Sequence, residues 1–127
     1  MSKKLKFDLV SPERLLVSSE VDGVQVPGQE GDFGVLPDHS AVISVIRPGI
    51  LSVNSGSDKQ EYYIRGGFAD VNENGLTVLA EYAVELSAFG ADAKAAEIEL
   101  AKSQLADSDD DQSRLSAQTI LDVVAAL

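Results

Sequence analysis

The chain has 127 residues, of which 44% are hydrophobic and 6% aromatic. This is enough for one globular domain, or for one small domain with an appendage. The formal net charge of −11 argues against binding nucleic acid or an anionic membrane surface, because both require patches of lysine and arginine. The sequence contains no cysteine, which excludes disulfides, thiolate zinc sites and a cysteine nucleophile.

The sequence gives no sign of a membrane segment or an export signal. No apolar run approaches the roughly 20 residues that a membrane-spanning helix needs. Residues 1–6 are basic but lead into alternating apolar and polar residues instead of an apolar core, so we expect no signal peptide.

Short segments with period-two alternation run from Leu5 to about Glu85, separated by turn residues. Asn74-Gly75 is a strong hairpin signal, and Gly66-Gly67 predicts a bulge or a tight bend. A further hairpin loop is expected at residues 54–58. About eight to ten short strands with regular turns indicate an antiparallel β-sandwich or barrel.

The stretch from Pro27 to His39 carries three glycines at three-residue spacing between two prolines. The residues alone predict a structured turn in a β domain. The glycine spacing fits neither dinucleotide nor Walker-type binding, and no helix follows to receive a phosphate. We expect this stretch to be one constrained loop that presents polar groups to another protein. These groups belong to Glu30, Asp32, Asp38 and His39.

Near Ser87 the pattern changes from strands to helices, because glycine and proline disappear and alanine becomes frequent. We expect Asp92 to cap a helix that runs to about Leu105. A second helix is expected from Gln112 or Ser113, with an apolar stripe at helical spacing. The stripe consists of Ala117, Ile120, Leu121, Val124 and Leu127.

Two helices joined by a short polar turn predict an antiparallel hairpin. The predicted fold class is therefore α+β, with an N-terminal antiparallel β-sandwich and a C-terminal two-helix hairpin. The expected domains are residues 1–87 and residues 88–127.

The acidic turn between the helices could suggest calcium, since Asp107, Asp109 and Asp111 occupy positions 1, 3 and 5 of an EF-hand loop. However, Gln112 and Gln118 stand where that loop needs glycine and a bidentate glutamate. A solvated turn is the better interpretation, and we expect no metal site.

His39 is the only histidine and would have to be the base in any small hydrolase built on this chain. No nucleophile elbow accompanies it, so a structural role is favoured. We expect no catalytic residues and no cofactor.

Several motifs occur in an order that is typical of one family. They are Pro27-Gly28, Glu30-Gly31-Asp32-Phe33-Gly34-Val35-Leu36-Pro37, Arg47-Pro48-Gly49, Gly66-Gly67-Phe68-Ala69-Asp70-Val71 and Leu76-Thr77-Val78-Leu79-Ala80-Glu81. The chain resembles the epsilon subunit of bacterial F1Fo ATP synthase from about Leu5 to its end, with these motifs in the first two thirds. The resemblance implies a β-sandwich followed by a helical hairpin.

By this resemblance the chain is a non-catalytic subunit of the central rotor stalk. Its sandwich would bind the gamma subunit and the polar loops of the c-ring, while its hairpin would reach the alpha/beta hexamer. Glu30, Asp32, Phe33, Asp38 and His39 would face the rotor partners. The location implied is peripheral, on the cytoplasmic face of the bacterial inner membrane, as part of the F1 sector.

Some members of this family block ATP hydrolysis with basic residues of an extended hairpin, or bind ATP through a motif like I-D-x-x-R-A. Here Asp92 is retained but Ala95 replaces the arginine, which loses a bidentate phosphate ligand. Residues 91–127 carry a net charge of −5, and Arg114 is nearly alone on the second helix. We therefore expect no ATP site and weak or absent inhibition.

A free-standing β-sandwich binding module is the alternative hypothesis. Such a module would contain a defined apolar ligand pocket and would remain monomeric in the presence of a gamma-like stalk.

Overall fold

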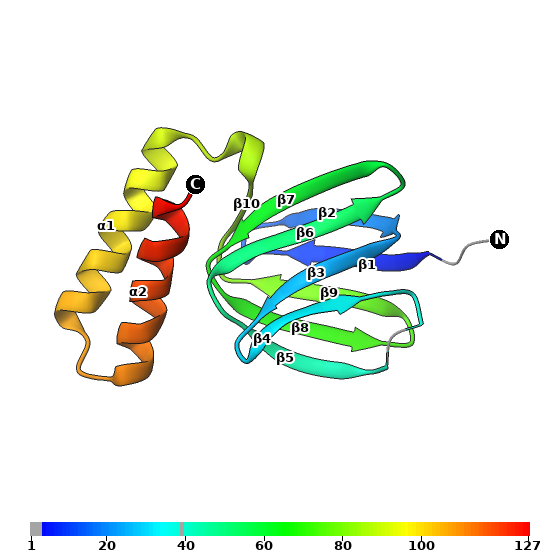
Figure 1. The fold of residues 1–127 in the computed structure, drawn as a ribbon, viewed down its shortest axis with the longest axis horizontal. Coiled ribbons are helices and arrows are strands. Elements are labelled where there is room, and N and C mark those ends of the chain that lie inside the picture. The colour runs from blue at the N-terminus through cyan, green and yellow to red at the C-terminus, as the bar shows by residue number, and fades with distance from the viewer. Residues whose placement is uncertain (1–3, 39) are drawn as a thin grey trace.

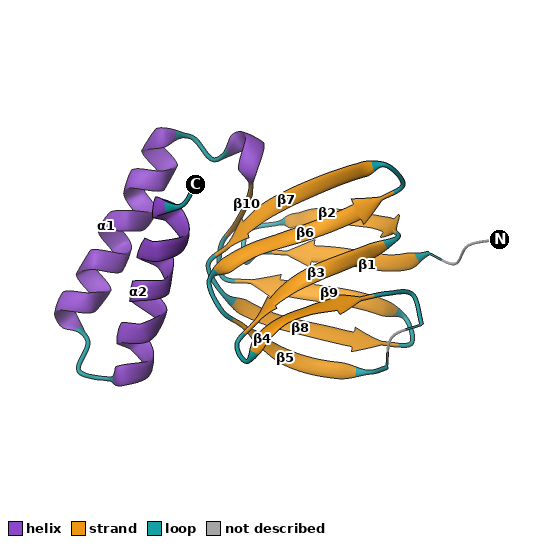
Figure 2. Cartoon of the chain, viewed as in Figure 1, coloured by secondary structure: helices purple, strands orange, loops and turns teal. Residues whose placement is uncertain are grey.

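The computed structural model describes residues 4–38 and 40–127 and contains a ten-stranded sheet followed by two α-helices (Figures 1 and 2). The strands are β1 (Leu5–Val10), β2 (Leu15–Val21), β3 (Gly23–Gly28), β4 (Gly31–Val35), β5 (Val42–Ile46), β6 (Gly49–Ser55), β7 (Asp58–Ile64), β8 (Gly67–Asn72), β9 (Gly75–Ala80) and β10 (Ala83–Glu85). A short 3₁₀ helix, η1 (Leu86–Ala88), leads to α1 (Ala91–Asp107) and α2 (Asp111–Ala125). The predicted α+β fold is confirmed.

The strands lie in the order β10-β7-β6-β3-β5-β8-β9-β1-β2, with β4 paired to β3 beside this path. The sheet curls into a sandwich around one core (Figure 1). The prediction of a wholly antiparallel sheet is wrong at one place, because β1 and β9 pair in parallel. Parallel neighbours need a long connection, and here all the strands from β2 to β8 supply it.

The core of the sandwich is built by alternating residues, as the sequence predicts. In β1, Leu5, Phe7 and Leu9 are only 3%, 0% and 0% exposed. Phe7 lies opposite Leu76 of β9 and Leu9 lies opposite Val78. Strands β1 to β9 each place at least one buried apolar side chain inside the curl, whereas β10 contributes only half-buried Ala83.

The turn between β8 and β9 is formed by Glu73 and Asn74, because Asn72 pairs with Gly75. The Asn72 side chain accepts a hydrogen bond from the Asn74 backbone N–H at 2.8 Å. The expected hairpin is thus present, but its turn begins one residue earlier than Asn74-Gly75. The 54–58 hairpin loop is confirmed, with Ser55 paired to Asp58.

The bend at Gly66-Gly67 is also confirmed. Both residues have positive φ, of 156° and 146°, and a Cβ on Gly67 would lie 1.9 Å from the Leu79 carbonyl oxygen. Glycine is therefore required at position 67 by conformation as well as by space.

The helices form an antiparallel hairpin that stands against one end of the sandwich, with α2 nearer the strands (Figure 1). Asp92 does not cap α1: Gly90 is the N-cap residue and Asp92 lies in the first turn. Asp110 caps α2 and accepts a hydrogen bond from the Ser113 backbone N–H at 3.0 Å. Within the described residues, neither helix is long and apolar enough to cross a bilayer.

The apolar stripe of α2 is confirmed in its central part. Ala117, Ile120 and Val124 are buried, whereas Leu121 is half-buried and Leu127 is 42% exposed. Ile120 and Val124 of the stripe pack with Tyr63 of the sandwich and Ala101 of α1, and the last residue of the stripe lies at the surface.

Candidate partner interface

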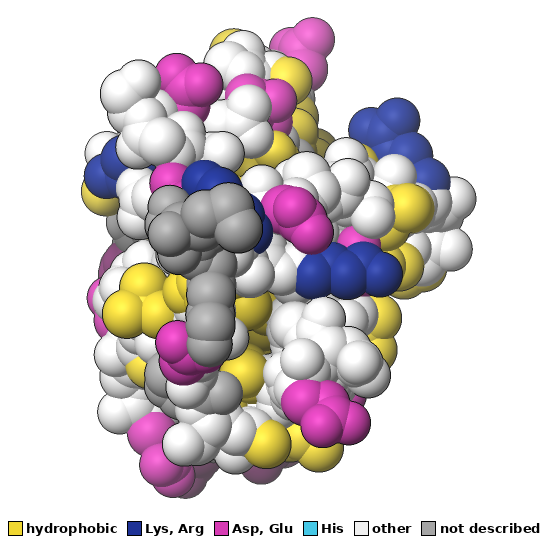
Figure 3. All heavy atoms as spheres, turned by 90° about the vertical axis from the view of Figure 1, so that its right-hand side faces the viewer, with side chains coloured by type: hydrophobic (Ala, Val, Ile, Leu, Met, Phe, Trp, Pro, Cys, Tyr) yellow, Lys and Arg dark blue, Asp and Glu magenta, His cyan; other side chains and the backbone are white. Residues whose placement is uncertain are grey.

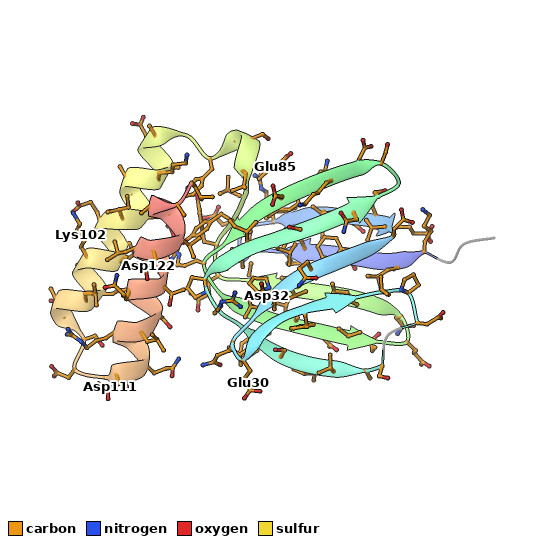
Figure 4. All side chains as sticks on the ribbon, in the orientation of Figure 1. Glu30, Asp32, Glu85, Lys102, Asp111 and Asp122 are labelled. Carbon is orange, nitrogen blue, oxygen red and sulfur yellow. The ribbon has the colours of Figure 1, made fainter. Side chains whose placement is uncertain are left out.

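The turn between β3 and β4 is fixed by Arg47, which comes from the segment after β5. One guanidinium nitrogen of Arg47 donates to the Gly28 carbonyl at 2.6 Å, and the other contacts Asp32 Oδ1 at 2.5 Å. Glu30 lies at the tip of the turn and is exposed, and its side chain points away from the sandwich (Figure 4). The turn is therefore a rigid support for two acidic side chains.

Phe33 belongs to the same turn, but its ring is half-buried against the core. A Cβ added to Gly28 would lie 2.8 Å from Phe33 Cε1, so the ring packs directly on the turn backbone. Glycine at position 28 makes this approach possible. Phe33 therefore supports the turn and offers little surface to a partner.

The expectation of one constrained loop is wrong, because residues Gly31–Val35 form β4. The turn with Glu30 lies at the hairpin end of the sandwich, whereas the segment after β4 lies at the other end (Figure 1). A five-residue strand spans roughly 16 Å. Asp38 is exposed at that other end, and His39 lies outside the described residues.

Gly31 and Gly34 fit a strand because, among the described strands, β4 pairs with β3 alone. Glycine in a strand is tolerated best where few neighbours must pack against it. The sequence reading treated these glycines as signs of a turn and therefore missed the strand.

An exposed row of apolar side chains crosses the outer face of the sheet. Val45, Phe68 and Leu79 lie opposite one another on β5, β8 and β9 and are 44%, 53% and 51% exposed. Half-buried Val10 continues the row on β1, next to Leu79. We call these four residues the apolar row. Ile43, on the same face of β5, is 75% exposed.

Sequence reasoning missed the apolar row, although a signal was present. Residues 41–46 are almost continuously apolar, which is typical of a strand that is covered on both faces. Contiguous exposed apolar surface marks interaction sites on soluble proteins. The end of the sandwich remote from the hairpin also exposes hydrophobic side chains among acidic and basic ones (Figure 3).

The hairpin docks on the sandwich through an aromatic and charged cluster. The Tyr63 and Phe89 rings stack with centroids 5.0 Å apart. Glu97 of α1 is 5% exposed and accepts a hydrogen bond from the Tyr63 hydroxyl at 2.9 Å. Burial raises the pKa of Tyr63, and the Glu97 carboxylate raises it further. The sequence analysis did not predict this contact.

A cavity of about 460 Å³ lies between part of the hairpin and the sandwich. Its polar lining includes Arg47, Arg65 and Ser113. Asp92 and Ala95, the positions considered for ATP, do not line this cavity and are exposed on α1. In the described part of the chain, no three acidic or histidine side chains are grouped closely enough to hold a metal ion.

Arg114, the single basic residue of α2, is engaged within the hairpin. Its guanidinium donates to the carbonyls of Leu105 and Ser108 at 3.0 and 3.4 Å. These contacts satisfy carbonyl groups at the C-terminal end of α1. The Arg114 guanidinium, which could otherwise contact an acidic partner, therefore stabilises the turn between the helices.

Comparison with known proteins identifies the family. The sequence-family model for the β-sandwich domain of the ATP synthase delta/epsilon chain matches residues 4–86 of this chain. This chain belongs to that family. It is 51% identical over 123 residues to the ATP synthase epsilon chain of Parvibaculum lavamentivorans, covering 96% of this chain and 93% of the relative. It is 41% identical over 128 residues to that of Paramagnetospirillum magneticum, covering 100% and 96%.

Solved structures agree with this assignment. A chain in the cryo-EM structure of the Euglena gracilis mitochondrial ATP synthase, which comprises OSCP, F1 and the c-ring, superposes with a TM-score of 0.71 and 28% identity, covering 96% of this chain and 78% of that chain. A chain from the central stalk and c-ring of the Tetrahymena thermophila mitochondrial enzyme superposes with a TM-score of 0.73 at 15% identity, covering 98% and 96%. The second likeness shows the shared fold.

Proposed function

We propose that this protein is a non-catalytic rotor subunit in the central stalk of a proton-translocating ATP synthase, where it couples the c-ring to the gamma subunit. Membership of the delta/epsilon family and 51% identity to a bacterial epsilon chain support this role. The observation that carries the proposal is the exposed apolar row of an otherwise acidic protein. Such a surface needs a partner.

The apolar row is proposed as the surface that binds gamma. Its three exposed side chains come from adjacent strands in direct register, so they form one continuous and rigid patch. Interface energy concentrates in a few large side chains near the centre of a patch, and Phe68 occupies that position here.

The β3–β4 turn is proposed as a contact to the polar loops of the c-ring. Arg47 holds the backbone of the turn and the Asp32 carboxylate in place, which reduces the entropy lost when Glu30 and Asp32 bind a partner. Asp38 lies beyond β4, so we assign it, together with its sequence neighbour His39, to a separate contact with the rotor.

The hairpin is proposed to reach the alpha/beta hexamer only weakly. Its acidic charge and the engagement of Arg114 leave little basic surface for inhibition. By the same proposal the chain is peripheral, held through the c-ring on the cytoplasmic face of the bacterial inner membrane.

The proposal is tested by binding to purified gamma. The double variant Phe68→Glu and Leu79→Glu should fold normally, because both side chains lie on the outer face, and should lose affinity by about 30-fold or more, which corresponds to a hot-spot loss of about 2 kcal/mol. The matched control is Leu115→Glu, which changes a side chain that is 61% exposed on α2, away from the apolar row. Failure of the unmodified chain to bind gamma or the c-ring would favour a free-standing binding module.

A second measurement addresses the turn and the hairpin in the assembled enzyme. Glu30→Lys with Asp32→Lys should weaken attachment to the c-ring, whereas Glu73→Lys, in the exposed β8–β9 turn, should not. Deletion of residues 88–127 should leave the rate of ATP hydrolysis nearly unchanged. A strong increase in hydrolysis would show that the hairpin is an effective inhibitor.

A further inference from the structure

The first helix of the hairpin has little shape complementarity with the sandwich, because few of its large side chains are buried there. Only Glu97 and Ala101 are buried in α1, and Ala101 carries only a methyl group. Ile98 is the one large apolar side chain of α1 that packs against the docking cluster, and it is only half-buried. Small side chains interlock weakly with their neighbours, so they do not resist sliding or rotation of a helix as large side chains do. Another feature must select the docked position of α1.

Glu97 has the properties required for this selection. It is the only buried charged residue in the described part of the chain. The Tyr63 hydroxyl donates to its Oε1 at 2.9 Å, and Arg65 Nε lies 3.3 Å from the same oxygen as an ion pair. The Arg65 guanidinium also lies over the Tyr82 ring, 5.0 Å from its centroid.

These partners of Glu97 all belong to the sandwich side of the contact. Tyr63 is in β7, Arg65 follows β7, and Tyr82 precedes β10. A carboxylate from the hairpin is thus satisfied by side chains that a rigid sheet holds in fixed positions.

We propose that Glu97 is the positioning residue that sets the register in which the hairpin docks on the sandwich. A shift of α1 by one turn, about 5.4 Å, would separate the carboxylate from Tyr63 and Arg65 and leave a buried charge without partners, which is costly. In the observed register the attraction of the pair is largely offset by its desolvation, so the pair contributes little net stability. Glu97 therefore acts by excluding other registers and contributes little to the overall strength of docking.

The test measures the hairpin position in the isolated full-length chain, so its outcome does not depend on the proposed rotor function. Because the protein has no cysteine, Ser57→Cys and Lys102→Cys allow spin labels on the β6–β7 turn and on the exposed side of α1. Pulsed electron resonance then gives the distribution of distances between the labels. The parent chain and the control Glu99→Ala, an exposed position on α1, should give one narrow distance.

Glu97→Ala should broaden or split the distance distribution while far-ultraviolet circular dichroism shows intact helices. Glu97→Gln should have an intermediate effect, because the amide oxygen still accepts from Tyr63 but the ion pair with Arg65 is lost. Tyr63→Phe, with the carboxylate retained, should broaden the distribution less than Glu97→Ala.

A double variant separates register from stability. Glu97→Leu with Arg65→Met replaces the pair by apolar groups, and it should keep the thermal midpoint of unfolding while still broadening the distances. An unchanged narrow distance in Glu97→Ala, or in the double variant, would overturn the proposal. Loss of helicity in Glu97→Ala together with a lowered midpoint in the double variant would also overturn it, since Glu97 would then act by stabilising the hairpin.

Discussion

The sandwich and the hairpin are held together by different kinds of contact. The sandwich buries large side chains from nearly every strand, and those that are almost fully inaccessible include Phe7, Leu9, Leu51 and Leu76. The hairpin rests on the end of the sandwich through a smaller cluster in which α2 contributes Ile120 and Val124. Burial of apolar area contributes about 25 cal/mol per Å², so the sandwich has much the larger share of the folding energy.

The two regions can therefore respond independently to a substitution. The sandwich core is one contiguous cluster that does not include the helices. The hairpin cluster depends on sandwich residues such as Tyr63 and Ile50. Damage to the sandwich should therefore remove both regions, whereas damage to the hairpin should leave the sandwich folded.

The largest effect is expected from Phe7→Ala. Phe7 is 0% exposed in the sandwich core, and removal of a buried phenylalanine ring costs about 3–5 kcal/mol. Urea unfolding followed by circular dichroism should show strand and helix signals lost together at a lower midpoint. Lys6→Ala, exposed on the same strand, is the control. Equal midpoints for Phe7→Ala and the parent would contradict the claim that the sandwich core supplies most of the folding energy.

Ile120→Ala should act on the hairpin alone. Ile120 is 2% exposed between α2 and the sandwich, and truncation of a buried isoleucine costs about 2–5 kcal/mol. Hydrogen exchange should become faster throughout α1 and α2, while the core amides of β1 and β9 keep their protection. Gln118→Ala, on the exposed side of α2, should change neither region. Faster exchange in the strands would show that the two regions unfold as one unit.

High pH should weaken the contact between the hairpin and the sandwich, by less than Ile120→Ala does. Burial raises the pKa of Tyr63 and Tyr82 in this contact, and that of Tyr62 in the sandwich core, above the usual value of about 10. A pKa raised in the folded state gives stability that is complete below about pH 10 and is lost as pH rises through the folded value. Spectrophotometric titration should show that all three phenols ionise at a higher pH in the folded chain than in the denatured chain. Tyr63→Phe should remove the phenol that ionises at the highest pH. Coincident titration of folded and denatured chains would refute this.

The smallest effect is expected at the N-cap of α2. The backbone N–H of Ser113 donates to the Asp110 carboxylate and lowers its pKa. The stability that the ionised Asp110 cap contributes is present above the ordinary aspartate pKa of about 3.9. It is lost as the pH falls through the lowered pKa of Asp110 in the folded chain. Asp110→Ala should slightly lower the thermal midpoint at neutral pH, whereas Asp109→Ala, in the same turn but not a cap, should not. Equal midpoints for the two variants at neutral pH would show that the cap contributes nothing.

Local sequence patterns determined most of the architecture. Period-two alternation in residues such as Leu5, Phe7 and Leu9 predicts which face of β1 is buried, because side chains of a strand alternate between its faces. The α2 stripe at Ala117, Ile120 and Val124 does the same for the hairpin. These patterns can be recognised in the sequence because each depends only on the spacing of apolar residues within one strand or helix.

The tertiary structure alone decided the features that join distant residues. The parallel pairing of β1 with β9 and the register that aligns Val45, Phe68 and Leu79 depend on which strands become neighbours. The burial of Glu97 depends on how the hairpin docks on the sandwich. The same holds for the two ends on which Glu30 and Asp38 lie, since a strand separates them where the glycines predicted a loop. Sequence spacing carries no record of such contacts, because the curl of the sheet brings together residues that no local period relates.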